Sequence, residues 1–255
     1  MKNLRFLTGL GGLVVLAFAI GFIFQFPLVT NIWPWPDGRL SYLFVGSILA
    51  AISVAALWVG WTGEFGALPA GSLNVLVIAG GTAIYFFQLA LQGGRSDLIP
   101  FGIVSLVSVI ASGAAFLWSR RIPLIDSRPM PGLVRVSFGV FIAALFLAGG
   151  ALVFRMPVFP WALNPDSSVI FGCIFIGDAF YFLYGLLYPR WHNAAGQLLS
   201  FLAYDLVLIV PFLLLFETVK PEYMLNLIVY VAVLVYSGGL AAYFLFVNPK
   251  TRLGS

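Results

Sequence analysis

The segment at residues 24–46, FQFPLVTNIWPWPDGRLSYLFVG, resembles a later one at residues 154–172, FRMPVFPWALNPDSSVIFG. Both begin with an aromatic residue and reach a proline three positions on. Both then pass through a stretch rich in Pro and Trp to a Pro-Asp pair, and both end in an apolar run that closes on glycine. A pattern that recurs in the same order predicts an internal repeat.

The composition predicts a polytopic integral membrane protein. Of the 255 residues, 62% are hydrophobic and only 9% are charged, whereas about 25% of the residues of a soluble protein are charged. The single Cys173 excludes a disulfide or a cysteine metal cluster within one chain, and the single His192 argues against a haem or histidine metal site. No cofactor and no metal are therefore expected. The basic residues are scattered between apolar runs, so nucleic acid is not an expected partner either.

A helix needs about 20 apolar residues to cross a bilayer. Dividing the chain at charged residues and at Pro/Gly breaks predicts an all-α fold with eight transmembrane helices. These spans are residues 6–26, 40–61, 72–91, 98–118, 134–154, 168–187, 195–216 and 223–246.

The repeat extends over all eight predicted spans. A shift of 130 residues places the first span on the fifth, and shifts of 129 and then 125 align the later ones. Matched positions are Arg5 with Arg135, Phe24 with Phe154, Pro27 with Pro157, Pro36-Asp37 with Pro165-Asp166, and Ser112-Gly113 with Ser237-Gly238. Four spans per half is an even number, so the prediction is two parallel four-helix repeats. The predicted halves are residues 1–119 and 134–255, joined by a cytoplasmic linker at residues 120–133.

The first span also has features of a signal peptide. Lys2 and Arg5 precede an apolar run, and the AFA at residues 17–19 is typical of a cleavage site. Its counterpart in the repeat lies in mid-chain and cannot be a cleaved signal. We therefore expect the first span to be a retained helix.

The basic residues predict the orientation, because cytoplasmic loops are enriched in Lys and Arg. With the N-terminus inside, nine of the 13 basic residues lie on the inner side and four on the outer side. The inner ones are Lys2, Arg5, Arg120, Arg121, Arg128, Arg135, Arg190, Lys250 and Arg252, and the outer ones are Arg39, Arg95, Arg155 and Lys220. Both termini are expected to be cytoplasmic, in a plasma (inner) membrane.

Two acidic residues, Asp178 and Asp205, lie mid-way along predicted spans. Their spans are consecutive and antiparallel, and each residue is about 15 Å from the same end, so the carboxyls can meet and share a proton. No basic residue lies in the middle of a span. Each carboxyl must therefore be protonated, hold a cation, or be hydrogen-bonded to a nearby hydroxyl. The candidate hydroxyls are those of Tyr181, Tyr184, Tyr204 and Ser200.

A purely structural interpretation stays open, since a protonated aspartate can tie two helices together by a hydrogen bond of about 0.6 kcal/mol. The first half has no acidic counterpart. Within its spans it offers Asn74, Gln88 and Ser53, as packing residues or ligand contacts.

These residues predict a transporter-like membrane protein that handles a proton, a small cation or a small solute. Its candidate site consists of Asp178, Asp205, Tyr181 and Tyr204. The alternative is a non-transporting membrane subunit or scaffold that binds a partner protein or lipid. The motifs H-E-x-x-H and G-x-S-x-G are absent, and no catalytic residue is predicted, so an enzyme is the less favoured class. Expected partners are the lipid bilayer, a small solute or ion, and a partner subunit or second copy of the chain.

Overall fold

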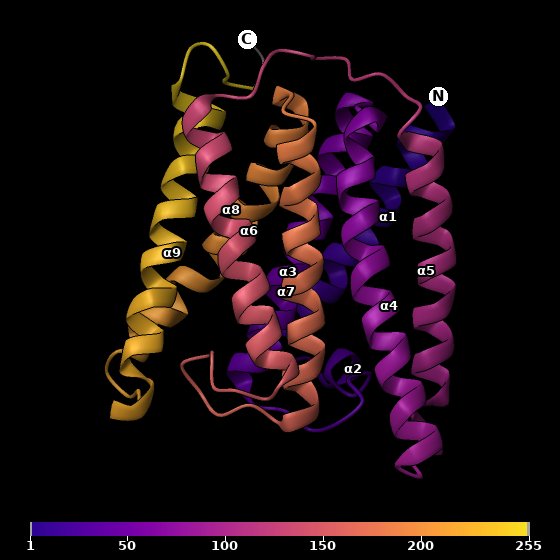
Figure 1. The fold of residues 1–255 in the computed structure, drawn as a ribbon, viewed down its shortest axis with the longest axis vertical. Helices are drawn as coiled ribbons and strands as arrows, with labels where there is room; N and C mark the ends of the chain where they lie inside the picture. Colours follow the sequence, from indigo (N-terminus) through magenta and orange to yellow (C-terminus); the bar gives the residue numbers. More distant parts are fainter. Residues whose placement is uncertain (1, 254–255) are drawn as a thin grey trace. The chain divides into compact units, whose positions relative to one another are not determined.

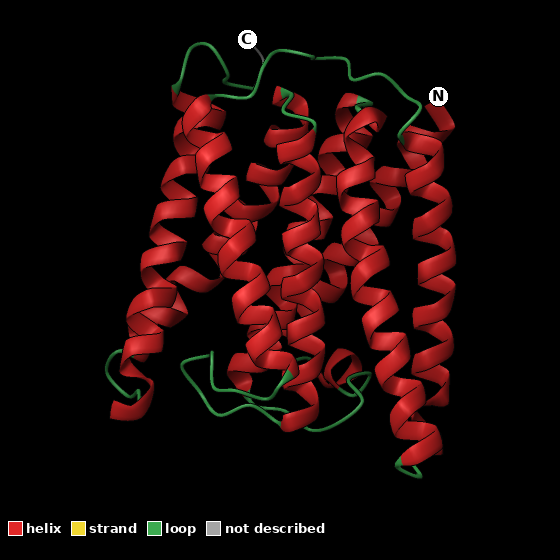
Figure 2. Ribbon diagram, in the orientation of Figure 1, coloured by secondary structure: helices red, strands yellow, loops and turns green. Residues whose placement is uncertain are grey.

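The computed structural model describes residues 2–253 of the chain, and these are all helix or loop apart from one isolated bridge between Pro129 and Arg190 (Figure 2). Eight long helices in this part of the chain are labelled in Figure 1. They are α1 (Lys2–Ile23), α3 (Arg39–Thr62), α4 (Leu68–Gln92), α5 (Ile99–Ser119), α6 (Gly132–Val153), α7 (Pro165–Leu187), α8 (Trp191–Leu215) and α9 (Met224–Ala242). Shorter elements are α2 (Pro27–Thr30), the 3-10 turns Phe65–Ala67, Ser96–Leu98 and Pro221–Tyr223, and a π-type turn, Tyr243–Val247, that continues α9.

All eight predicted spans are confirmed as helices that are long and apolar enough to cross a membrane. Their ends differ from the predicted ends by at most four residues, taking α9 together with the π-type turn that continues it. The described part of the chain is thus all-α, and the eight helices indicate an integral membrane protein.

Helix ends follow from local sequence. Gly63 ends α3 in the left-handed region with φ +78°, where glycine has no steric penalty, and its N–H bonds to the carbonyl of Val59. Asn164 caps α7 by accepting a hydrogen bond from the N–H of Asp166 at 2.9 Å. The proline at the first position of α7 suits that site, because the N–H it lacks would have no partner in the helix.

The turns after α1 and α6 have the same conformation. Gln25 has φ +55° and Arg155 has φ +60°, and among residues 2–253 these are the two residues other than glycine with positive φ. In both turns this residue bonds to the carbonyl three positions back, and the next residue bonds to the carbonyl five positions back. The two turns lie 130 residues apart (155 − 25), the shift found in the sequence.

The chain divides into two compact units. Unit 1 comprises Met1–Glu64, Phe159–Leu163 and Ala194–Ser255, and unit 2 comprises Phe65–Val158 and Asn164–Asn193. Unit 1 thus contains α1, α3, α9 and nearly all of α8, and unit 2 contains α4 to α7. The two units are groups of helices that pack together, whereas the two halves of a repeat are groups of helices that resemble each other in sequence and structure. The predicted halves therefore stay a prediction.

In unit 1, α1 packs closely on α3. A Cβ added at Gly60 would lie 2.8 Å from the backbone nitrogen of Gly9, so α3 needs glycine here for α1 to approach closely. Ser53 on α3 donates a hydrogen bond to the carbonyl of Gly12 at 2.9 Å, so this candidate polar residue serves helix packing. The second Pro/Trp passage adds Phe159, which is fully buried and packs on Phe44 with ring centroids 4.8 Å apart.

In unit 2, α6 packs on α7 and α4 packs on both α5 and α7. A Cβ at Gly172 of α7 would lie 2.7 Å from the carbonyl oxygen of Gly149, so α6 and α7 also meet through glycine. Part of the predicted linker belongs to this unit. Met130 donates to the carbonyl of Pro189, and Trp191 donates to that of Arg128, which fastens the linker to the loop between α7 and α8.

Candidate site around two buried carboxyls

Asp178 lies near the middle of α7, at its fourteenth residue of 23. Its Oδ1 accepts a hydrogen bond from Nδ2 of Asn74 on α4 at 2.8 Å. Asn74 is 7% exposed, and its own Oδ1 is buried with no hydrogen-bond partner among the described residues. The sequence identified Asn74 as a polar residue within a span, and the structure of unit 2 pairs it with the predicted acid.

The close approach of α4 and α7 depends on Gly177. A Cβ at this position would lie 2.9 Å from both the backbone oxygen and Oδ1 of Asn74, and 2.4 Å from Ile78. Gly177 therefore allows the asparagine to reach the neighbouring Asp178.

Asp205 lies mid-way along α8 and is 4% exposed. Its Oδ2 accepts a hydrogen bond at 2.9 Å from Oγ of Ser237 on α9, and its side chain lies against Gly238, at 3.4 Å from a Cβ built there. Its Oδ1 is buried and has no hydrogen-bond partner among the described residues. Neither Asp178 nor Asp205 has an ion-pair partner within residues 2–253.

The two predicted tyrosines lie next to the acids along the chain. Tyr204 directly precedes Asp205 and is hydrogen-bonded through its hydroxyl to Tyr230 on α9. Tyr181 is buried one turn after Asp178, with its ring 5.5 Å from that of Phe182. The hydrogen-bond partners of the acids are Asn74 and Ser237, so the tyrosines belong to the surroundings of the carboxyls.

Asp178 belongs to unit 2 and Asp205 to unit 1. Each acid has its hydrogen-bond partner within its own unit, and a proton shared between the two acids stays a prediction. Their chemistry is alike, because each pairs with a neutral group on another helix that can both donate and accept a hydrogen bond.

Unit 2 contains a polar cluster that was not predicted, made by Tyr85, Arg155 and Asp166. The hydroxyl of Tyr85 donates to Asp166 Oδ1 at 2.6 Å, and Arg155 donates to the Tyr85 hydroxyl at 3.2 Å. The guanidinium and carboxylate are 3.6 Å apart. Arg155 and Asp166 flank the second Pro/Trp passage in sequence, and the cluster ties the two ends of that passage to α4.

A second cluster in unit 2 lies at the linker. The Asp126 carboxylate accepts a hydrogen bond from Nε of Arg128 at 2.8 Å, and Nε2 of His192 is 3.4 Å away. Partial burial alone would raise the pKa of Asp126. The hydrogen bonds from Arg128 and the charges of His192 and Arg128 outweigh burial, so the pKa is lowered from 3.8.

Comparison with protein-family models, curated proteins and solved structures gives no significant match.

Proposed function

We propose that this chain is a transporter-like membrane protein that takes up and releases a proton at Asp205, with Asp178 as a second protonatable group. A buried carboxyl can exchange a proton repeatedly only if its surroundings accept both the ionised and the neutral form. The partners of both acids meet this condition.

The geometry at Ser237 carries the proposal. Its Oγ lies 2.9 Å from Asp205 Oδ2 and 2.7 Å from the carbonyl oxygen of Val233. A hydroxyl has one hydrogen to donate and lone pairs with which to accept. With Asp205 ionised, Ser237 donates to the carboxylate. With Asp205 protonated, the acid donates to Ser237, whose hydrogen then turns to the carbonyl of Val233. No heavy atom has to move between the two states.

Asn74 gives Asp178 the same freedom. Its amide has a donating and an accepting end of nearly the same shape. The donating end faces the carboxylate at 2.8 Å, and half a turn of the amide would present the accepting end to a protonated acid. A lysine or arginine at either position could only donate, and would hold the carboxylate in its ionised form.

Infrared difference spectroscopy of the protein in lipid bilayers tests this proposal, since it detects the C=O stretch of a protonated carboxylic acid. We expect a band that changes with pH and is lost in Asp205→Asn. Ser237→Ala should shift it. Ser237→Thr, which keeps the hydroxyl, and the matched control Ser112→Ala should leave it in place.

Proton uptake into liposomes is the functional counterpart. Asp205→Asn should abolish it without loss of helical content. Two results would contradict proton exchange at these residues. One is a C=O band of the wild-type protein that does not change with pH, and the other is a band that persists in both Asp178→Asn and Asp205→Asn.

The second candidate function is a membrane scaffold or subunit without transport. It is favoured by the fact that both carboxyl hydrogen bonds join different helices, α7 to α4 and α8 to α9, as packing contacts do. The α5 span, only 17% of which is buried, would then offer a lateral apolar face to a partner protein or a second copy. A scaffold would show no pH-dependent carboxyl band.

We further propose that the chain consists of two parallel repeats, with α1, α3, α4 and α5 corresponding to α6, α7, α8 and α9. Three sets of local features support this. The bounds of α1 and α6 differ by 130 residues at both ends, and the 3-10 turns before α5 and α9 differ by 125. The turns after α1 and α6 match bond for bond. Gly46 packs on the carbonyl of Ala19 as Gly172 packs on that of Gly149.

The composition of the two units supports the repeat as well. Under this correspondence the counterparts of α1, α3, α8 and α9 are α6, α7, α4 and α5, so the helices of unit 1 map onto those of unit 2. In an experimental structure the two halves should superpose after a rotation of about half a turn around the membrane normal. An inverted axis would rule out a parallel repeat.

We also propose that both termini are cytoplasmic, in a plasma (inner) membrane. The excess of Lys and Arg on the side of the N-terminus supports this orientation.

A further inference from the structure

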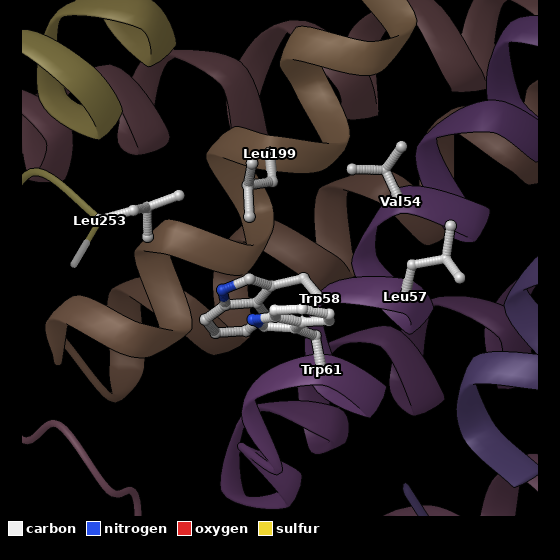
Figure 3. A pocket seen from close by; sticks show the side chains of 6 residues that line it. All are labelled: Val54, Leu57, Trp58, Trp61, Leu199 and Leu253. Carbon is white, nitrogen blue, oxygen red and sulfur yellow. The ribbon is translucent and has the colours of Figure 1, made fainter. Parts of the chain in front are cut away.

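Unit 1 has an apolar pocket of about 370 Å³ at the end of α3. It is lined by Val54, Leu57, Trp58, Trp61, Leu199 and Leu253. In Figure 3 the two indoles lie between Leu253 on one side and Leu57 on the other. The volume is within the range of small-ligand sites, and apart from the indole N–H groups the lining side chains have no polar atoms.

The pocket lies where a membrane headgroup region is expected. Trp58 and Trp61 are in the last turns of the apolar helix α3, which ends at Thr62, and tryptophan is enriched at the level of lipid headgroups. Trp61 is 82% exposed. Its ring therefore lies on the side of the pocket that is open to the surroundings.

A positive charge is fixed beside the pocket. Arg5 on α1 donates from Nε to the carbonyl of Gly60 at 3.1 Å and also donates to the carbonyl of Trp61, one of the lining residues. The close contact of Gly9 with Gly60 holds α1 at this position. A guanidinium has five N–H donors, so donors remain for a further acceptor.

The Arg5 guanidinium forms no ion pair in the part of the chain that the structure describes, and α1 contains no acidic residue. Lys2 precedes it by three positions, on the same face of the helix. An apolar pocket beside a guanidinium without an ion pair among the described residues matches a ligand with an apolar tail and an anionic head.

We propose that this pocket binds an acyl chain of an anionic phospholipid, and that Arg5 binds its phosphate. The guanidinium suits a phosphate because it can donate two parallel hydrogen bonds. This site is independent of proton exchange at Asp205.

Native mass spectrometry of the full chain, purified in detergent, tests the site. Phosphatidylglycerol and phosphatidylcholine with identical acyl chains are added in turn, and the bound fraction is measured. Wild-type protein should retain phosphatidylglycerol about fivefold more tightly, the factor that one interfacial arginine contributes toward an anionic lipid surface. Equal retention of the two lipids would overturn the proposal.

Two kinds of variant distinguish binding of the phosphate by Arg5 from binding of the acyl chain in the pocket. Arg5→Gln should reduce phosphatidylglycerol retention to that of phosphatidylcholine. Arg39→Gln, which removes the same charge at the other end of α3, should not. Val54→Phe, which fills the pocket, should lower retention of both lipids. If Arg5→Gln fails to fold, Arg5→Lys takes its place. This variant keeps the positive charge and should retain the preference for phosphatidylglycerol over phosphatidylcholine. Unchanged retention in Val54→Phe would show that no acyl chain occupies the pocket.

Discussion

Gly177→Ala tests the packing of α4 against α7, on which the contact between Asn74 and Asp178 depends. The added methyl group would lie 2.4 Å from Ile78 and 2.9 Å from two oxygens of Asn74. The isoleucine can change rotamer, but one of the oxygens is backbone and the other belongs to a side chain held by Asp178. The methyl group should therefore force the helices apart.

Overpacking of this kind costs about 1–3 kcal/mol, while alanine is favoured over glycine inside a helix by about 1 kcal/mol. Subtracting the second value from the first predicts a net loss of about 0–2 kcal/mol in the free energy of unfolding. The variant should therefore be about 1–3 kcal/mol less stable than one that gains the same helix propensity without overpacking. The matched control is Gly139→Ala on α6, where a Cβ meets no atom within 4 Å. That variant should be neutral or up to about 1 kcal/mol more stable.

Reversible unfolding in mixed micelles, followed by circular dichroism, measures both values. Equal free energies of unfolding for Gly177→Ala and Gly139→Ala would refute the close approach of the two helices.

Three further predictions follow from other parts of the chain. Asp205→Leu should destabilise the fold by about 1–2 kcal/mol through loss of its interhelical hydrogen bond, whereas Asp205→Asn should be nearly neutral in the same unfolding assay; equal losses would show that the bond to Ser237 contributes nothing. Because the pKa of Asp126 is lowered from 3.8, its stabilisation of the linker should be complete above about pH 4 and lost as the pH falls through the lowered value. Hydrogen exchange should show this loss, and Asp126→Asn should expose the linker already at neutral pH. With Cys173 replaced, a thiol reagent added outside intact cells should label Asn31→Cys and not Ser127→Cys, and the opposite result would reverse the orientation.

The helices could be predicted because the length of an apolar run decides whether a segment spans a membrane. Their starts were less predictable. The α1 helix begins at Lys2 rather than at residue 6, because Lys and Arg are good helix formers and the helix continues beyond the apolar run. The α8 helix begins at Trp191 rather than at residue 195, where the bond from Trp191 N–H to the linker satisfies one donor of its first turn.

The two acids were predictable because a charge within an apolar run is visible in the sequence. Their partners were not. Asn74 is 104 residues from Asp178, and Ser237 is 32 residues from Asp205. Which side chains meet depends on how each helix is rotated about its axis, and helices that are apolar on all sides do not encode that rotation in their hydrophobic pattern.

The division into units has a consequence for the order in which the protein is completed in the membrane. Synthesis proceeds from the N-terminus, so unit 2 has all its helices once α7 has been made. Unit 1 must wait, with α1 and α3 already inserted, until α8 and α9 follow. Asp205 on α8 precedes Ser237 on α9 in the chain, so it gains its hydrogen-bond donor only when α9 packs on α8. A buried acid without its hydrogen-bond donor is costly in lipid, and this cost is removed only when the last helix is in place.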